Sequence, residues 1–251
     1  MTAAPELRDP AAPAPTRREC ADTATLAAGL ASEIAAALRS AIARRGQAML
    51  AVSGGKSPLA LFAALREQAL DWKRVTVLLA DERCVPLQHP DSNAALVRAH
   101  LLQGRAAAAR WLPFCEQLPP GDSAGWSDAE LDALTAAANA RLAALPWPLD
   151  ALVLGMGEDA HTASLFPGAP GLETALQSRE PVAWVRPATA PHARLTLTLP
   201  TLLDATTTFL PLAGARKRAV FELACCGASA EAPISLVLHR ATRPVQVWLA
   251  P

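Results

Sequence analysis

The strongest constraint on the fold is the alternation of short apolar runs with longer alanine-rich segments of helical periodicity. The runs AMLAV at 48–52, VTVLLA at 75–80 and DALVL at 150–154 are apolar enough to form buried strands. Over residues 23–44 apolar side chains recur at helical spacing, and Gly46 follows as a stop signal. Strands that alternate with helices usually pair in parallel through crossover connections. The pattern therefore predicts an α/β fold built on a mostly parallel sheet.

The remaining segments extend this pattern along the chain. Further helices are expected over residues 59–68, 94–102, 127–145 and 217–225, and further strands over 182–185, 194–199, 207–212, 234–238 and 245–249. Glu130 is the expected capping-box partner of Ser127. We expect a flexible tail rich in Ala and Pro over residues 1–15 and a single α/β domain over 16–251, in which 127–148 is a helical excursion.

Charge and cysteine content restrict the partners and the compartment. The 251 residues include 23 basic and 23 acidic ones, so the chain lacks the global field that draws proteins to nucleic acid or anionic membranes. Its 5 scattered cysteines form no CxxC pair and suit a reducing compartment. We find no secretory signal and no apolar run approaching the roughly 20 residues that cross a bilayer. We expect a cytoplasmic protein, monomeric or weakly homo-oligomeric, with a small-molecule partner and no nucleic-acid or membrane partner.

Three polar clusters each follow an expected strand. They lie at residues 53–57, 81–83 and 155–164. In an open parallel sheet the carboxyl ends of the strands share one edge, and ligands bind there near the point where the strand order reverses. The three clusters are therefore expected to meet around one site.

The first cluster is a loop that can present backbone N–H groups to an anion. It reads SGGKSP at 53–58 and includes Gly54, Gly55, Lys56 and Ser57. Glycines allow close approach of the backbone, and the N-terminus of the next helix favours negative charge. The spacing fits neither the GxxxxGK[ST] nor the GxGxxG phosphate-binding pattern. From the loop alone, a phosphate site and an ordinary strand-to-helix turn both remain open.

The second cluster carries two carboxylates and a guanidinium at a strand end. Asp81 and Arg83 flank Glu82 there. Arginine suits bidentate contact with phosphate or carboxylate groups. A solvated salt-bridge cluster is the alternative reading of the same residues.

The third cluster contains a histidine on a glycine-flanked loop, GMGEDAHTAS at 155–164. An imidazole placed there suits acid–base work near neutral pH, and Asp159 could orient the ring of His161 or hold substrate hydroxyls. No second His or Cys stands at metal spacing and no GxSxG motif is present, so neither a zinc site nor a serine esterase is expected. Farther along, Arg194 starts an expected strand and Lys217 lies near a helix start, where both could meet an anion or simply face solvent.

Taken together, these motifs resemble the 6-phosphogluconolactonases, which are relatives of the glucosamine-6-phosphate isomerases. The matching stretches are VSGGKSP at 52–58, DERCVP at 81–86, DSN at 91–93, LVLGMGEDAHTASLFPG at 152–168, RLTLTLP at 194–200 and GxxK at 214–217. The resemblance implies a Rossmann-like open, mostly parallel sheet with helices on both faces, and neither metal nor organic cofactor. It implies hydrolysis of 6-phospho-D-glucono-1,5-lactone to 6-phospho-D-gluconate, the second step of the oxidative pentose phosphate pathway.

The resemblance also suggests roles for individual residues. His161 matches the catalytic histidine of the family and is expected to activate water, with Asp159 and Asp81 as further candidate bases. Arg83 or a backbone N–H of residues 155–160 is expected to stabilise the oxyanion. The expected substrate- and phosphate-binding residues are Gly54, Gly55, Lys56, Ser57, Gly157, Arg194 and Lys217.

Two features bear on the alternatives to a lactonase. The isomerase relatives carry a glutamate shortly after the histidine, whereas residues 164–167 read SLFP here, which argues against an aldose–ketose isomerase. The family usually has glycine where this chain has Ala160, and alanine is strained there if the backbone needs a positive φ. A catalytically weak sugar-phosphate-binding homologue therefore stays open as the other alternative.

Overall fold

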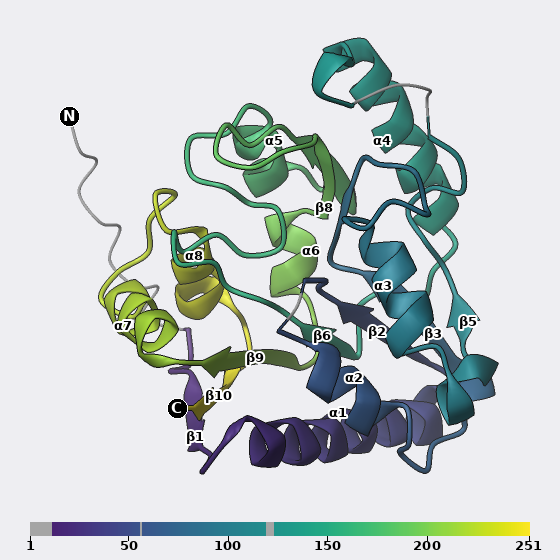
Figure 1. Cartoon of the computed structure of the whole chain (residues 1–251), viewed down its shortest axis with the longest axis vertical. Coiled ribbons are helices and arrows are strands. Elements are labelled where there is room, and N and C mark those ends of the chain that lie inside the picture. Colours follow the sequence, from purple (N-terminus) through teal and green to yellow (C-terminus); the bar gives the residue numbers. More distant parts are fainter. Residues whose placement is uncertain (1–11, 56, 119–122) are drawn as a thin grey trace.

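The computed structural model describes residues 12–55, 57–118 and 123–251, and its core is a parallel β-sheet (Figure 1). Within these residues the sheet has seven strands in the order β1-β10-β9-β6-β2-β3-β5, and every neighbouring pair is parallel. The strands are β1 (Thr16–Glu19), β2 (Ala48–Val52), β3 (Val75–Leu79), β5 (Arg110–Trp111), β6 (Ala151–Val153), β9 (Thr208–Ala213) and β10 (Gln246–Ala250). The expected parallel α/β sheet is confirmed.

Helices flank this sheet, as expected. Figure 1 shows α1 running along one side of it, with α6 and α8 on the other. The α-helices are α1 (Thr23–Arg45), α2 (Leu59–Leu65), α3 (Asn93–His100), α4 (Asp128–Leu142), α5 (Leu172–Gln177), α6 (Leu199–Leu203), α7 (Ala215–Ala224) and α8 (Pro233–Arg240). Short 3-10 turns cover Trp72–Arg74, Gly104–Ala108 and Ser123–Gly125. The expected capping box forms at α4, where Ser127 and Glu130 exchange side-chain and backbone hydrogen bonds.

A second, smaller sheet carries the cluster at residues 81–83. It is antiparallel, in the order β4-β8-β7, with β4 at Asp81–Arg83, β7 at Val182–Val185 and β8 at Arg194–Leu197. Residues 81–83, expected as the polar end of a parallel strand, therefore form a strand of their own. Its register places Arg83 directly opposite Arg194. This pairing brings two guanidinium groups, separated by more than a hundred positions in the sequence, to neighbouring strands.

The expected strand at 234–238 is wrong, because the segment is part of helix α8. Pro233 occupies the first turn, and His239 and Arg240 lie in the last turn, which are ordinary signals of a helix start and end. All residues from Pro233 to His239 are buried, so the run shows no alternation of polar and apolar faces. A short, fully apolar run cannot distinguish a buried helix from a buried strand.

Helix α1 corrects the expectation about long apolar runs. It has 23 residues, and an 18-residue window within it has a mean hydropathy of 1.4, so the helix is long and apolar enough to cross a membrane by length and composition. However, Leu30, Ile34 and Leu38 on α1 are fully buried in the core of the protein. Burying each such side chain contributes about 1.5–3 kcal/mol. Since a core helix passes the same length test, the finding is weak evidence for a membrane span.

The N-terminal strand defines where the ordered sheet begins. Residues Thr16–Glu19 form β1 and pair with the last strand, β10. The start of the expected domain at residue 16 coincides with this edge strand. Of the expected tail, residues 1–11 lie outside the described part of the chain.

The strand order reverses between β2 and β6. From β2 the chain moves outward to β3 and β5, and β6 then returns to the other side of β2. The carboxyl ends of β2 and β6 therefore lie at the reversal point, which is where open α/β sheets bind ligands.

Candidate functional site

A cavity of about 260 Å³ opens at this reversal point. The loops after β2 and β6 contribute to its wall, together with β4, β8 and the start of α7. The three polar clusters thus meet around one cleft, as expected. The expected site residues that line it are Gly54, Gly55, Ser57, Asp81, Arg83, Gly157, His161, Arg194 and Lys217. Asp159 is not among the residues that line the cavity, but its carboxylate contacts the His161 ring. Lys56 lies outside the described residues.

The loop after β2 approaches its neighbours too closely for a side chain at Gly54. A Cβ there would lie 1.8 Å from Oδ1 of Asn93, so only glycine fits without displacing the Asn93 side chain. Ser53 ties this loop to the one after β6, because its Oγ accepts a hydrogen bond of 3.2 Å from the backbone N–H of Gly155. Two loops from neighbouring strands are held together as one wall of the cavity.

The loop after β2 also meets a cation from α7. Lys217 on α7 directs its Nζ to Oγ of Ser57 at 3.4 Å. Ser57 precedes α2, and both side chains line the cavity. The pair offers one positive charge and hydrogen-bond donors from both side chains to an anion.

The two arginines of the small sheet lie side by side. Arg83 donates from Nη1 to the backbone carbonyl of Asp91 at 2.7 Å. Arg194 is only 6% exposed, and burial lowers the pKa of its guanidinium while the nearby Asp81 carboxylate opposes that change. Within the described residues, the buried Nε of each arginine lacks a hydrogen-bond partner. Two guanidinium groups at the wall of one cavity favour an anionic or strongly polar ligand.

Asp81 and its neighbour Glu82 are buried beneath the arginines. The carboxylate of Asp81 accepts a hydrogen bond of 2.7 Å from Oγ of Ser164, and its backbone carbonyl accepts one of 2.8 Å from Nδ2 of Asn93. Glu82 accepts from the backbone N–H groups of Asn93 and Ala94 at the start of α3. Burial nevertheless raises the pKa of Glu82 to about 7, against the opposing effect of these hydrogen bonds.

His161 is held on two sides. Its Nδ1 lies 2.5 Å from Oδ1 of Asp159, and its ring stacks on Phe166 with 4.1 Å between centroids and 21° between planes. The close approach depends on Gly157, where a Cβ would lie 2.2 Å from Nδ1 of His161. A carboxylate only accepts, so Nδ1 carries the hydrogen and Nε2 is the nitrogen left to take a proton.

Comparison with known proteins agrees with this geometry. Residues 21–248 match the family described as glucosamine-6-phosphate isomerases/6-phosphogluconolactonase. A 6-phosphogluconolactonase of Neisseria meningitidis is 45% identical over 223 residues, covering 88% of this chain and 93% of the relative. One from Pseudomonas aeruginosa is 47% identical over 201 residues, covering 79% and 80%. The crystal structure of a 6-phosphogluconolactonase from Shewanella baltica has a TM-score of 0.83 at 36% identity, covering 94% of this chain and 98% of that one. The chain belongs to this family.

Ala160 departs from the usual family residue at a position where the backbone is strained. Its φ of 63° lies in the left-handed region, where alanine costs roughly 1–2 kcal/mol. The turn persists because the N–H of Ala160 donates to the carbonyl of Gly157 at 3.1 Å and its own carbonyl accepts from Ile234 at 3.0 Å. Alanine was expected to be strained here if φ were positive, and φ is positive. The hydrogen bond from Ile234 on α8 helps to hold the loop in this conformation.

Sequence reasoning did not identify several residues that support this family site. Asn93, Ser164 and Phe166 fall within matched motifs but were given no role. Their contacts with Gly54, Asp81 and His161 cross between elements, so no local spacing reveals them. Within residues 164–167, the stretch that stands where the isomerases carry a glutamate, Ser164 is fully buried and bonded to Asp81.

Proposed function

We propose that this chain hydrolyses 6-phospho-D-glucono-1,5-lactone to 6-phospho-D-gluconate, with His161 as the general base. The observation that carries the proposal is the His161–Asp159 pair, 2.5 Å apart, at a cavity that also presents Arg83, Arg194 and Lys217. An oriented neutral imidazole suits activation of water, and the cations suit an anionic sugar phosphate. Family membership supports the lactone as the substrate.

In the proposed reaction, Nε2 of His161 takes a proton from water as the water oxygen bonds to the lactone carbonyl carbon. The resulting tetrahedral oxyanion collapses, the bond from that carbon to the ring oxygen breaks, and the ring oxygen takes the proton back from the imidazolium. Asp159 stabilises the imidazolium form and keeps the ring oriented. General base catalysis of this kind contributes roughly 10²–10⁴-fold.

The hydrogen-bond pattern favours Arg83 as the group that stabilises the oxyanion. The alternative donors are backbone N–H groups of residues 155–160, but three of these six, those of Gly155, Gly157 and Ala160, already donate to Ser53, His161 and Gly157 respectively. Arg83 is a cation that lines the same cavity and is held in place by its hydrogen bond to the carbonyl of Asp91. Donors aimed at a developing oxyanion are worth several kcal/mol.

The phosphate is proposed to bind at the outer part of the cavity. Ser57 and Lys217 supply side-chain donors, and Gly54 and Gly55 supply backbone N–H groups at the start of the turn into α2. Arg194 adds a second cation from β8, and Lys56 belongs to the same loop in sequence. Binding energy gained there orients the lactone without taking part in the chemistry. We propose that the protein acts in the cytoplasm, as a monomer or weak homo-oligomer.

The backbone conformation of Ala160 supports a second candidate function. The positive φ of Ala160 stores strain in the loop that carries His161, which favours a sugar-phosphate-binding homologue of low activity. The two candidates differ in turnover rather than in ligand.

A coupled assay with freshly generated 6-phosphogluconolactone tests the proposal. Product formation is measured for the wild-type chain, His161→Asn and His100→Asn, with spontaneous hydrolysis subtracted at each pH. His100 is an exposed histidine on α3 and serves as the matched control. Activity in the wild type and His100→Asn, with loss in His161→Asn, is expected. Binding of 6-phosphogluconate without lactone turnover in the wild type would support the low-activity homologue instead.

A further inference from the structure

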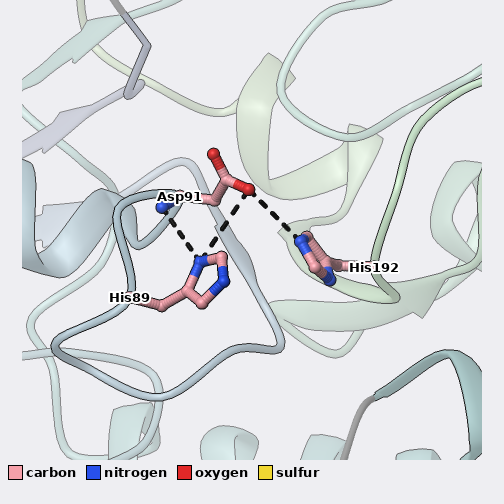
Figure 2. Close-up of side chains that lie close together, drawn as sticks. All are labelled: His89, Asp91 and His192. Atoms are coloured by element: carbon pink, nitrogen blue, oxygen red, sulfur yellow. Dashed lines mark hydrogen bonds and ion pairs between the residues drawn. The ribbon is translucent and has the colours of Figure 1, made fainter.

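Two histidines and an aspartate meet outside the proposed catalytic pair, and we call them the His–Asp–His cluster (His89, Asp91 and His192). Figure 2 shows Asp91 between the two imidazole rings. Its Oδ2 lies 3.8 Å from Nδ1 of His89 and 3.3 Å from Nε2 of His192. His89 and Asp91 belong to the loop between β4 and α3, whereas His192 belongs to the connection between β7 and β8. The cluster therefore joins two loops at the small sheet.

The spacing of these three atoms matches a tetrahedral metal site. Zinc binds imidazole nitrogen and carboxylate oxygen at about 2.0–2.2 Å, so neighbouring ligand atoms in a tetrahedron lie roughly 3.3–3.6 Å apart. The two distances to Asp91 are close to this value, and one ligand atom from each residue lies within 4.8 Å of the others. The two histidine nitrogens lie within 4.8 Å of each other, and these partly exposed side chains can close what remains of that separation.

The hydrogen bonds of the cluster show what a bound cation must displace. The backbone N–H of Asp91 donates to Nδ1 of His89 at 3.1 Å, so this nitrogen is unprotonated, and its single lone pair must exchange that donor for the ion. Nε2 of His192 lies 3.3 Å from Oδ2 of Asp91. A carboxylate only accepts, so this nitrogen carries a proton, and a metal ion binding there replaces that proton. His192 also has a φ of 69°, and a non-glycine residue in this region persists only when its surroundings hold it there.

We propose that the His–Asp–His cluster binds one zinc ion, with water as the fourth ligand. Two imidazoles and one carboxylate are donors that zinc accepts readily, in contrast to the all-oxygen sets that suit calcium or magnesium. The ion sits outside the catalytic pair and takes no part in the hydrolysis. The proposal does not rest on the proposed activity, since it concerns only the loops that carry these three residues.

A zinc ion at the cluster would help to position the two arginines of the cavity. The carbonyl of Asp91 accepts the 2.7 Å hydrogen bond from Arg83, and His192 lies two residues before Arg194. Both arginines line the cavity. Zinc bound to Asp91 and His192 ties together the two loops that position these guanidinium groups, and it stabilises the folded chain because the unfolded chain does not hold the three ligands together.

Zinc titration of the metal-stripped full chain tests the proposal directly. ZnCl₂ is added in competition with a chromophoric chelator, to the wild type, His192→Ala, His89→Ala and His100→Ala. We expect one zinc ion per chain in the wild type and in His100→Ala, with affinity weakened by at least about tenfold in His192→Ala and His89→Ala. Equal affinity in all four proteins, or no binding to the wild type at micromolar zinc, would overturn the proposal.

A second measurement separates this site from binding by cysteine thiols. Cobalt(II) in a nitrogen and oxygen site gives weak visible bands, whereas cobalt bound to thiolate adds an intense near-ultraviolet band. The wild type should show the former alone and His192→Ala neither. ZnCl₂ should also raise Tm in the wild type and His100→Ala but not in His192→Ala. A thiolate band that persists in His192→Ala would assign the zinc to cysteine and refute the cluster as its site.

Discussion

Replacing Glu82 by glutamine measures how much the raised pKa of this buried carboxyl group changes the stability of the fold with pH. Glu82 is 4% exposed and accepts hydrogen bonds from the backbone N–H groups of Arg83, Asn93 and Ala94. Burial raises its pKa from 4.5 to about 7 in the folded chain. Between these two pH values the folded state binds a proton that the unfolded state has released, so the free energy of unfolding falls as the pH rises.

The size of this effect follows from the two pKa values of Glu82. Each pH unit between 4.5 and about 7 contributes up to about 1.4 kcal/mol, which gives roughly 3 kcal/mol over the window and no further change above it. Glutamine does not titrate. The difference in unfolding free energy between the wild type and Glu82→Gln should therefore fall by about this amount between pH 4.5 and 7, with the wild type losing stability relative to the variant.

Urea denaturation followed by tryptophan fluorescence at several pH values between 5 and 8 provides the measurement. Glu130→Gln is the matched control, because Glu130 also accepts at a helix N-terminus but is exposed and has a lowered pKa. Its contribution is present above pH 4.5 and is lost only below it, so the control difference should be flat in this range. A flat or rising difference for Glu82→Gln would show that the N–H donors at α3 outweigh burial, and would refute the reasoning.

Three further outcomes are expected. His161→Asn should lower kcat by roughly 10²–10⁴-fold in the coupled assay with little change in product affinity, whereas retained kcat with lost affinity would reduce the residue to substrate binding. Lys217→Ala should raise KM with little change in kcat, and the effect should shrink for gluconolactone without phosphate; equal losses on both substrates would mean a structural role. In Ala160→Gly, relief of about 1–2 kcal/mol of strain is offset by a lost methyl contact and by the freedom of glycine in the unfolded chain. Thermal unfolding should therefore shift by only a few degrees and activity should stay within a few-fold, and a large gain in activity would favour the low-activity homologue.

The sequence by itself was sufficient for five strands of the main sheet (β2, β3, β6, β9 and β10) and for the place of the site, but it did not predict the edge strands β1 and β5. The runs at 48–52 and 150–154 became neighbouring central strands because buried parallel strands need continuous apolar stretches, which are visible locally. The loops that follow them met because parallel strands end at the same edge of a sheet. His161 and the loop with Gly54 and Ser57 could therefore be assigned to one cleft from the sequence alone, and both line the cavity.

Other features depended on contacts that no local pattern encodes. Residues Pro233–His239 of helix α8 are all buried, so the run predicted a strand although Pro233 and the basic last turn are local signals of a helix. The pairing of Arg83 with Arg194 arises from the antiparallel register of the small sheet. The positive φ of Ala160 depends in part on the hydrogen bond from Ile234 on α8.

The His–Asp–His cluster shows the same limit most clearly. Spacing along the chain predicted no metal site, because His192 lies 101 residues from Asp91. The two loops meet only because β4 pairs with β8 in the small sheet. Periodicity and turn signals report the preferences of a segment for its own conformation, whereas the approach of distant segments is decided by strand register and side-chain packing across the whole fold.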